Sequence, residues 1–149
     1  LEGLPLVTGW LRGSGPTEIT IHEHQWQLTL DVAEGHKTGY YLDQRDNRKA
    51  FADAVRQYGS KTVLNCFSYT GGFSVAALAG GATDVISIDS SGPALARATA
   101  HVALNGFDAS QHRAMDADVN ASLRAFNAAY YGKPWSGGWP APLSSHPAR

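Results

Sequence analysis

The residues best suited to chemistry lie in a glycine-containing turn at 67–73, directly after an apolar run at 62–67. Gly71 and Gly72 allow the backbone to approach a ligand closely, and Asp89 ends a second apolar run at 85–88. A strand, a glycine turn, a helix, a second strand and an acid form the layout of an α/β nucleotide site, in which the carboxylate accepts hydrogen bonds from ribose hydroxyls. The pattern therefore predicts a site for a nucleoside-containing cofactor.

The spacing of the glycines distinguishes two kinds of cofactor. A dinucleotide site requires G-x-G-x-x-G, with three glycines arranged around a pyrophosphate, whereas this turn has only the adjacent pair Gly71 and Gly72. S-adenosylmethionine (SAM) has no phosphate, so its site needs one close backbone approach beside the methionine part. The turn favours SAM and makes an NAD-type dehydrogenase a poor alternative.

The composition narrows the class of protein. The 149 residues suit one domain with a core of its own, and 43% are hydrophobic while 17% are charged. A net charge of −1 shows no global positive field of the kind that marks a nucleic-acid binder. One cysteine excludes an intramolecular disulfide framework, no apolar run is long enough to span a membrane, and the start has no signal-peptide pattern. We expect a cytoplasmic protein whose sequence begins within a longer one.

The strands and helices expected on either side of this turn predict an α/β fold. Alternating apolar residues at 17–33 predict a β-hairpin with its turn at 23–25, and helical spacing predicts a helix at 46–58 capped by Asp43 or Asp46. Parallel strands are expected at 62–67 and 84–88, with a helix at 73–78 between them that ends at Gly80 and Gly81. A second helix begins near Pro93 and stops at Asn105–Gly106; residues 112–119 form a third strand or a loop, before a short helix through Phe126.

Two long strings identify a family. Residues 36–48, HKTGYYLDQRDNR, and residues 65–73, NCFSYTGGF, closely resemble the class I SAM-dependent methyltransferases of large-subunit ribosomal RNA that make 5-methylcytosine. The resemblance covers residues 1–126. It implies a Rossmann-like methyltransferase domain that follows a PUA domain and a β-hairpin region. The chain then divides into a hairpin or linker region at 1–35, the N-terminal part of the SAM-binding domain at 36–126, and an irregular Gly/Pro/Trp tail at 127–149 that lacks helical or strand periodicity.

The resemblance also implies roles for individual residues. Asp89 matches the acid that binds the ribose hydroxyls, with Ser90 beside it near the adenine, and Asp118 matches the acid that takes the adenine amino group, with Asp116 as the nearby competitor. Asn65 stands where many of these enzymes have an acid at the end of the first strand. The turn around the methionine part comprises Tyr69, Thr70, Gly71, Gly72 and Phe73, and the signature segment against the cofactor contributes Lys37, Thr38, Gln44 and Arg45.

Departures from the family pattern limit the expected activity. The family continues with an Asp-Pro-Pro-x-Phe motif that positions the target base and, later, a motif that supplies the nucleophilic cysteine; residues 127–149 resemble neither. His101 stands where the family often has asparagine. We expect weak SAM binding and no methylation of RNA by this chain alone. The alternatives are a non-catalytic SAM- or RNA-binding module and a fragment that needs a partner.

Other residues have more ordinary explanations. Cys66 ends a buried strand without a neighbouring His or Lys, so it is expected to be a small hydrophobic residue and no catalytic residue is assigned. A surplus of three positive charges over residues 36–61 fits either a solvated helix face or contacts with RNA phosphates. The histidines lack metal-ligand spacing. Half of a doubly wound sheet leaves an apolar edge strand, which predicts self-association; ribosomal RNA is the expected partner of the full-length relative, and no membrane is expected.

Overall fold

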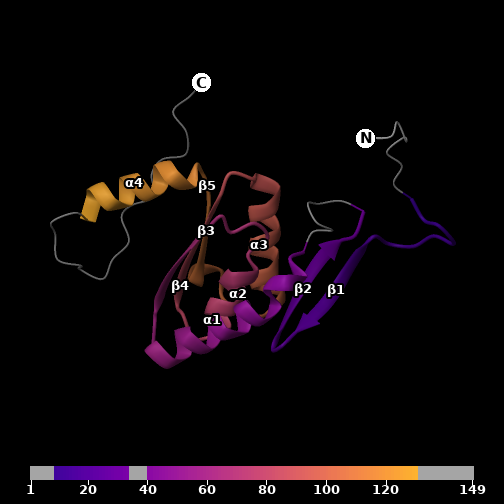
Figure 1. Cartoon of the computed structure of the whole chain (residues 1–149), viewed down its shortest axis with the longest axis horizontal. Coiled ribbons are helices and arrows are strands. Elements are labelled where there is room, and N and C mark those ends of the chain that lie inside the picture. The colour runs from indigo at the N-terminus through magenta and orange to yellow at the C-terminus, as the bar shows by residue number, and fades with distance from the viewer. Residues whose placement is uncertain (1–8, 34–39, 131–149) are drawn as a thin grey trace, which may run out of the picture.

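The computed structural model describes residues 9–33 and 40–130 (Figure 1). Its elements alternate along the chain after an initial hairpin, which is the order of an α/β fold. In sequence they are β1 (Glu18–Glu23), β2 (Trp26–Asp31), the 3-10 turn η2 (Leu42–Gln44), α1 (Arg45–Tyr58), β3 (Thr62–Cys66), α2 (Gly72–Ala79), β4 (Asp84–Asp89), α3 (Gly92–Leu104), the 3-10 turn η3 (Ala109–Gln111), β5 (His112–Asp116) and α4 (Val119–Tyr130).

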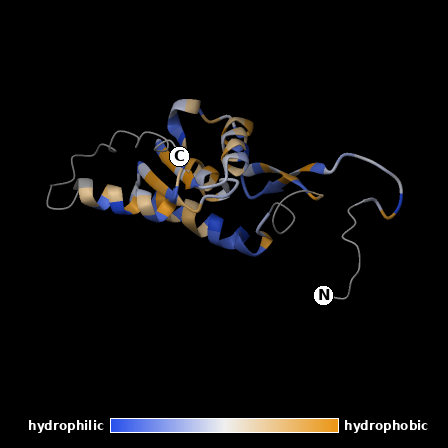
Figure 2. Ribbon diagram, turned by 90° about the horizontal axis from the view of Figure 1, so that it is seen from above, coloured by the Kyte–Doolittle hydropathy of each residue, from blue (hydrophilic) through white to orange (hydrophobic). Residues whose placement is uncertain are grey.

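The strands β3, β4 and β5 form a parallel sheet in that order, as the α/β prediction requires. Successive side chains point to opposite faces of the sheet. Val63 and Val85 pack in a core cluster with residues of α1, α2 and α3, whereas Ile86 and Ile88 pack with Val119 and Phe126 of α4. Figure 2 shows these central strands largely in hydrophobic colours. Helices therefore cover both faces, and the carboxyl ends of the three strands meet at one edge.

The hairpin packs on the α/β unit through one face of β2. Trp26 and Leu28 are buried in the same cluster as Val75 and Val102, while β1 is mostly exposed. The backbone of Gln27 also donates to Asn105 Oδ1 (2.7 Å), and its carbonyl accepts from Asn105 Nδ2 (2.8 Å). The predicted hairpin and its turn are confirmed, and Asn105 both ends α3 and binds the hairpin.

Helices α1 and α2 approach each other closely at Gly80. A Cβ atom there would lie 2.5 Å from the carbonyl oxygen of Ala52 and 2.9 Å from Val55 Cβ. Gly80 itself has a right-handed conformation (φ −73°), and it is Gly81 that turns the chain with φ +105°. The Gly pair ends α2 as expected, but the two glycines do different work: the first permits packing and the second permits the turn.

Several boundaries differ from the sequence prediction. Helix α1 starts at Arg45 after Gln44, which makes no side-chain cap bond, so the predicted caps Asp43 and Asp46 are wrong. Residues 112–116 are a strand, which decides between the two alternatives. Helix α4 continues to Tyr130, so an irregular structure from residue 127 is wrong for 127–130, where two alanines favour helix. The rest of the predicted tail, 131–149, lies outside the described residues.

Membrane-spanning helices and metal-binding clusters are both absent from the described residues. None of the helices at 9–33 and 40–130 is both long and apolar enough to cross a membrane. Within the same residues, no cluster of His, Cys, Asp and Glu side chains has the arrangement needed to hold a metal ion.

Candidate cofactor site

The turn after β3 alternates into the left-handed backbone region. Phe67, Tyr69 and Gly71 have φ values of +55°, +48° and +76°. The turn is joined to β4 because the N–H of Ser68 donates to the carbonyl of Ile88 (3.0 Å), and it closes on itself because Gly71 N–H donates to the carbonyl of Ser68 (2.9 Å). Left-handed backbone disfavours residues with a Cβ by about 1–2 kcal/mol each. The structure therefore holds two aromatic residues in strained positions at this turn.

Gly71 is required by its surroundings as well as by its backbone angle. A Cβ atom on Gly71 would lie 2.5 Å from Ala98 Cβ, so no other residue fits against α3 without movement. Gly72 begins α2 and approaches the Arg48 side chain, where a Cβ would lie 3.1 Å from Cδ. The glycine pair predicted from the sequence thus seats the turn between α1 and α3.

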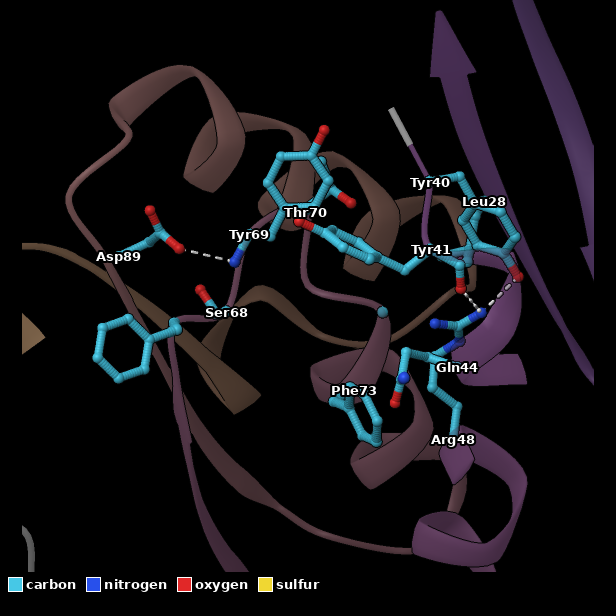
Figure 3. Close-up of a pocket in the computed structure, with 12 residues that line it drawn as sticks. Leu28, Tyr40, Tyr41, Gln44, Arg48, Ser68, Tyr69, Thr70, Phe73 and Asp89 are labelled. Atoms are coloured by element: carbon cyan, nitrogen blue, oxygen red, sulfur yellow. Dashed lines mark hydrogen bonds between the residues drawn. The ribbon is translucent and has the colours of Figure 1, made fainter. Parts of the chain in front are cut away.

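Asp89 joins two loops at the carboxyl end of β4. Its Oδ2 accepts from the N–H of Tyr69 (2.8 Å) and its Oδ1 accepts from the N–H of Ser91 (3.0 Å), as Figure 3 shows for Tyr69. The cap of α3 is Ser91, whose Oγ accepts from Ala94 N–H (3.4 Å). Asp89 is therefore not the helix cap that a purely structural explanation requires. Each carboxylate oxygen keeps a second lone pair for another donor.

A cavity of about 300 Å³ opens between this turn, the hairpin and the start of α1 (Figure 3). Its walls combine five aromatic rings with a few polar groups, which is typical of a small-molecule site. Tyr41 and Tyr69 meet edge to face across it, with ring centroids 5.5 Å apart. The lining residues are Leu28, Tyr40, Tyr41, Gln44, Arg48, Phe67, Ser68, Tyr69, Thr70, Gly72, Phe73 and Asp89.

A buried ion pair supports one wall of the cavity. Arg48 (3% exposed) donates from Nε and Nη2 to the two carboxylate oxygens of Glu23 (1% exposed), both at 2.7 Å. Arg48 Nη2 also donates to the Tyr40 hydroxyl (2.6 Å) and the Tyr41 carbonyl (3.1 Å), so the pair fixes both tyrosines. Trp26 Nε1 donates to Glu23 Oε1 (3.2 Å). The sequence reasoning missed this pair.

The basic side chains at 36–61 therefore lie in more than one kind of environment. Arg48, one of its six cations, is buried in an ion pair and is unavailable to RNA phosphates. Lys49 and Arg56 both bind Asp53 on the exposed face of α1, at 2.6 Å and 3.2 Å. This is the arrangement of a solvated helix face.

Most of the predicted turn residues line the cavity, together with Gln44 and Asp89, and Gly71 lies within the turn. Arg45 and Ser90 are exposed and do not line it. Asn65 points toward α2, where its Nδ2 donates to Ser74 Oγ (2.8 Å). Lys37 and Thr38 lie outside the described residues.

The two candidate acids for adenine occupy different positions. Asp118 precedes α4, and its Oδ1 accepts from the N–H of Ala121 (2.6 Å), which is the bond of a helix cap. Asp116 ends β5 directly opposite Asp89, and its Oδ2 would lie 3.2 Å from a Cβ on Gly92. Asp116 therefore lies beside Asp89, the residue expected to bind the ribose, whereas the Asp118 carboxylate is hydrogen-bonded to the first turn of α4.

Ser68 is a site residue that sequence reasoning missed. It is 7% exposed, lines the cavity, and its Oγ is the buried side-chain atom without a hydrogen-bond partner among the residues that the structure describes. Buried hydroxyls are normally paired with protein, water or ligand. A serine between two bulky residues in a turn carries no signal in sequence that separates it from an ordinary turn residue.

Cys66 has the environment expected of a packing residue. Its side chain lies with Leu64 against the cluster of Ile86, Ile88 and Phe126, on the α4 face. Burial raises the pKa of the Cys66 thiol, which disfavours the reactive thiolate.

His101 connects the cofactor turn to the hairpin. Its Nδ1 lies 2.8 Å from the carbonyl of Thr70, and its Nε2 accepts from the N–H of Thr29 (2.9 Å). Nε2 also lies 2.9 Å from the carbonyl of Thr29, so each ring nitrogen faces a backbone carbonyl. These contacts favour the protonated ring, whereas burial favours the neutral ring and has the larger effect on the pKa of His101. His112 is buried beside Ser87, whose Oγ lies 2.8 Å from its Nε2.

These two buried histidines predict a pH-dependent stability. Burial lowers the pKa of His101 and of His112 below the ordinary 6.5. Near and below that pH, the unfolded chain therefore binds more protons than the folded chain. Stability is complete above pH 6.5 and is lost as the pH falls toward the folded pKa values. We expect the free energy of unfolding in urea to decline as the pH falls below about 6.5.

The control for this decline uses an exposed histidine. A chain with His101→Gln and His112→Gln should lose most of the decline, whereas His22→Gln, at an exposed position of β1, should keep it. Stability that stays constant or rises over this range in the unmodified chain would contradict the assignment of the two buried rings as neutral.

Comparison with known families agrees with this geometry. The family model described as S-adenosylmethionine-dependent methyltransferase matches residues 6–126. The chain belongs to the S-adenosylmethionine-dependent methyltransferases. The resemblance noted in the sequence is confirmed at this level, and SAM is the cofactor of the family.

Relatives and solved structures of methyltransferases cover the same region. Ribosomal RNA large subunit methyltransferase I of Alteromonas mediterranea is 48% identical over 126 residues, which are 85% of this chain and 31% of that protein. The Escherichia coli protein of the same name is 47% identical over 127 residues, 84% of this chain and 31% of the relative. This chain therefore spans about a third of the length of these curated relatives.

The structural neighbours confirm the Rossmann-like fold. A SAM-dependent methyltransferase from Streptococcus mutans superposes with a TM-score of 0.70 at 31% identity, over 79% of this chain and 31% of that one. A methyltransferase crystallised with S-adenosylhomocysteine (SAH) gives 0.70 at 32% identity, over 79% of this chain and 30% of the other. Such neighbours place methyltransferase chemistry on this α/β framework.

The residues of the cavity suit SAM. The cofactor carries a ribose diol, which suits the lone pairs of Asp89, and an ammonium and a carboxylate, either of which suits the unpaired Ser68 hydroxyl. The aromatic walls suit its apolar surface, and the single close backbone approach at Gly71 and Gly72 needs no phosphate. The fit rests on these groups of the protein.

Proposed function

We propose that this chain is the cofactor-binding part of a methyltransferase that makes 5-methylcytosine in large-subunit ribosomal RNA. The observation that carries the cofactor half is the junction of the glycine turn with Asp89, whose carboxylate binds the Tyr69 N–H at the edge of a 300 Å³ cavity. The RNA half is supported by relatives named ribosomal RNA large subunit methyltransferase I at 47–48% identity.

Within this proposal the residues at the turn divide the cofactor among them. Asp89 accepts the ribose hydroxyls, and Ser68 and the backbone of the turn hold the methionine part, with Tyr69, Thr70, Gly71, Gly72 and Phe73 around it. Ser90 and either Asp116 or Asp118 serve the adenine. Gln44 lies in the wall, whereas Arg45 and Asn65 do not line the cavity. Lys37 and Thr38 lie outside the described residues, and the roles of these four residues stay proposals from the resemblance.

The chemistry of the proposal requires groups beyond those described. SAM supplies an electrophilic methyl group when it is bound. In the family resembled, a cysteine thiolate adds to C6 of cytosine, and C5 then attacks the methyl carbon before the C5 proton is removed. The described residues contribute binding and orientation of the cofactor. Cys66, with its raised pKa, is a poor thiolate, so this chain alone is not expected to transfer a methyl group.

Self-association and a cytoplasmic location are also part of the proposed function. Strand β3 lies at one edge of the three described parallel strands, with Leu64 and Cys66 half-buried, which supports self-association or pairing with the rest of a longer protein. The division into regions 1–35, 36–126 and 127–149 and the cytoplasmic location stay predictions.

A chimera tests the proposal on RNA. In the chimera, residues 6–126 of this chain replace the matching segment of the Escherichia coli relative. We expect this protein to transfer radiolabelled methyl to the same rRNA cytosine as that relative. The isolated chain should incorporate no label, and the chimera with Asp89→Ala should lose activity. A folded, SAM-binding chimera that leaves the rRNA unlabelled would contradict the RNA assignment, and label incorporated by the isolated chain would contradict its incompleteness.

A further inference from the structure

His101 is a buried side chain of α3 whose two ring nitrogens bind different parts of the structure. The residue is 1% exposed. Its Nε2 lies 2.9 Å from both the N–H and the carbonyl oxygen of Thr29 on β2, and its Nδ1 lies 2.8 Å from the carbonyl oxygen of Thr70 in the cofactor turn. A carbonyl only accepts, so the bond to Thr70 requires a proton on Nδ1. One buried ring therefore joins the hairpin to a residue that lines the cofactor cavity.

Asn105, one helical turn further along α3, shows that attachment of the hairpin does not require a bond to the turn. Its side chain accepts from the N–H of Gln27 and donates to the Gln27 carbonyl, in the same way that His101 faces the two backbone groups of Thr29. Side chains four residues apart lie on the same face of a helix. Both residues therefore fasten β2 to α3. The bond from Nδ1 to the cofactor turn is the additional contact of His101.

The peptide unit between Thr70 and Gly71 is hydrogen-bonded on both of its sides. The Thr70 carbonyl accepts from His101 Nδ1. The N–H of Gly71 donates to the carbonyl of Ser68 (2.9 Å). The carbonyl and the N–H belong to one planar unit and point in opposite directions, so the two bonds together fix its orientation. Without the His101 bond this unit rotates more easily, because glycine accepts both signs of φ.

The orientation of this peptide unit shapes the wall of the cavity. Thr70 and Tyr69 both line the cavity (Figure 3), and the N–H of Tyr69 donates to Asp89. We propose that His101 is a positioning residue for the cofactor: by binding the Thr70 carbonyl it holds the turn in the shape that binds SAM. This inference rests on the proposed SAM site. It assigns the contacts with Thr29 to folding stability and the contact with Thr70 to SAM affinity.

Asparagine and leucine at position 101 form a matched pair for the test. Their side chains have a similar shape and both are shorter than the imidazole that reaches Thr29, but only asparagine keeps a donor near the position of Nδ1. We expect His101→Asn to keep the SAM affinity of the unmodified chain. His101→Leu should bind SAM about 3-fold to 10-fold more weakly, which is the effect of one hydrogen bond. Titration calorimetry measures the affinity, and circular dichroism establishes that each variant is folded at the temperature of the titration.

Asn105→Leu is the control for attachment of the hairpin. It removes the bonds to Gln27 and leaves the Thr70 bond in place, so it should lower the melting temperature without changing SAM affinity. Equal SAM affinity in His101→Asn and His101→Leu overturns the positioning role. A loss of affinity in Asn105→Leu as large as that in His101→Leu also overturns it, because affinity then follows the attachment of the hairpin.

A measurement on the unmodified chain covers the case in which a variant does not fold. Nitrogen-15 NMR of the His101 ring should show a proton on Nδ1 that exchanges more slowly with solvent once SAM is added, because the bound cofactor holds the turn. An Nδ1 without a proton in the SAM-bound chain, or a proton whose exchange SAM does not slow, overturns the inference. A folded unmodified chain that binds no SAM overturns the proposed cofactor site itself, whereas the other outcomes leave that site in place.

Discussion

Replacing Arg48 with methionine is expected to lower the free energy of unfolding by about 3–5 kcal/mol. The substitution keeps an unbranched apolar stem but leaves the Glu23 carboxylate buried with only Trp26 Nε1 as a donor from the present network. An uncompensated buried charge is far more unfavourable than the pair itself is favourable. Urea denaturation followed by circular dichroism at neutral pH measures the change.

The double variant separates the charge from the packing. Arg48→Met with Glu23→Leu removes both charges and should recover a large part of the loss, because a buried pair and an apolar pair of similar volume are close in stability. Lys49→Met, which breaks an exposed pair on the same helix, should have a far smaller effect. A loss for Arg48→Met no greater than that for Lys49→Met would show that the pair does not support the wall of the cavity.

The substitution Gly71→Ala is expected to destabilise the chain by about 2–5 kcal/mol. Two effects add: the left-handed backbone (φ +76°) disfavours any Cβ, and the new methyl group would lie 2.5 Å from Ala98 Cβ. The turn must move away from α3, which also displaces the Tyr69 N–H from Asp89. Thermal and urea unfolding measure the stability, and SAM affinity should fall with it.

Matched glycines separate the two effects. Gly106→Ala has the same kind of backbone angle (φ +74°) with nothing within 4 Å of the new Cβ, so it reports the backbone strain alone. The pair Gly71→Ala and Ala98→Gly removes the 2.5 Å contact with Ala98 Cβ but leaves Ala98 Cα at 3.0 Å, so it should recover part of the difference between these variants. Equal losses at positions 71 and 106 would contradict the close approach of the turn to α3.

Local patterns in the sequence predicted the framework of the site well. The apolar runs at 62–67 and 84–88, with the glycine pair between them, predicted two parallel strands and the turn. Buried strands and left-handed turns depend on residue types that are close together in the sequence, so local patterns indicate them. Asp89 was placed correctly at the end of its strand. The hairpin followed from alternation alone, with the turn at the expected residues.

Contacts between distant residues were beyond the sequence. Glu23 and Arg48 are 25 residues apart, and nothing in either neighbourhood distinguishes them from surface charges. The strained Phe67 and Tyr69 occupy conformations that favour glycine, so residue type argues against what the tertiary structure imposes. Asp118 matched an adenine acid by position, yet its carboxylate binds the first turn of α4. Such choices depend on which partners the fold brings near.

The central claim is that the turn and Asp89 form a SAM site, and calorimetric titration of SAM into the folded chain tests it most directly. We expect saturable binding that weakens by about 10-fold to 150-fold in Asp89→Ala, because a hydrogen-bonded charged acceptor is lost. Asp84→Ala, at the opposite end of the same strand where it pairs with Arg113, should bind as the unmodified chain does. A well-folded chain that shows no saturable heat with SAM, or that binds equally well without Asp89, would contradict the account.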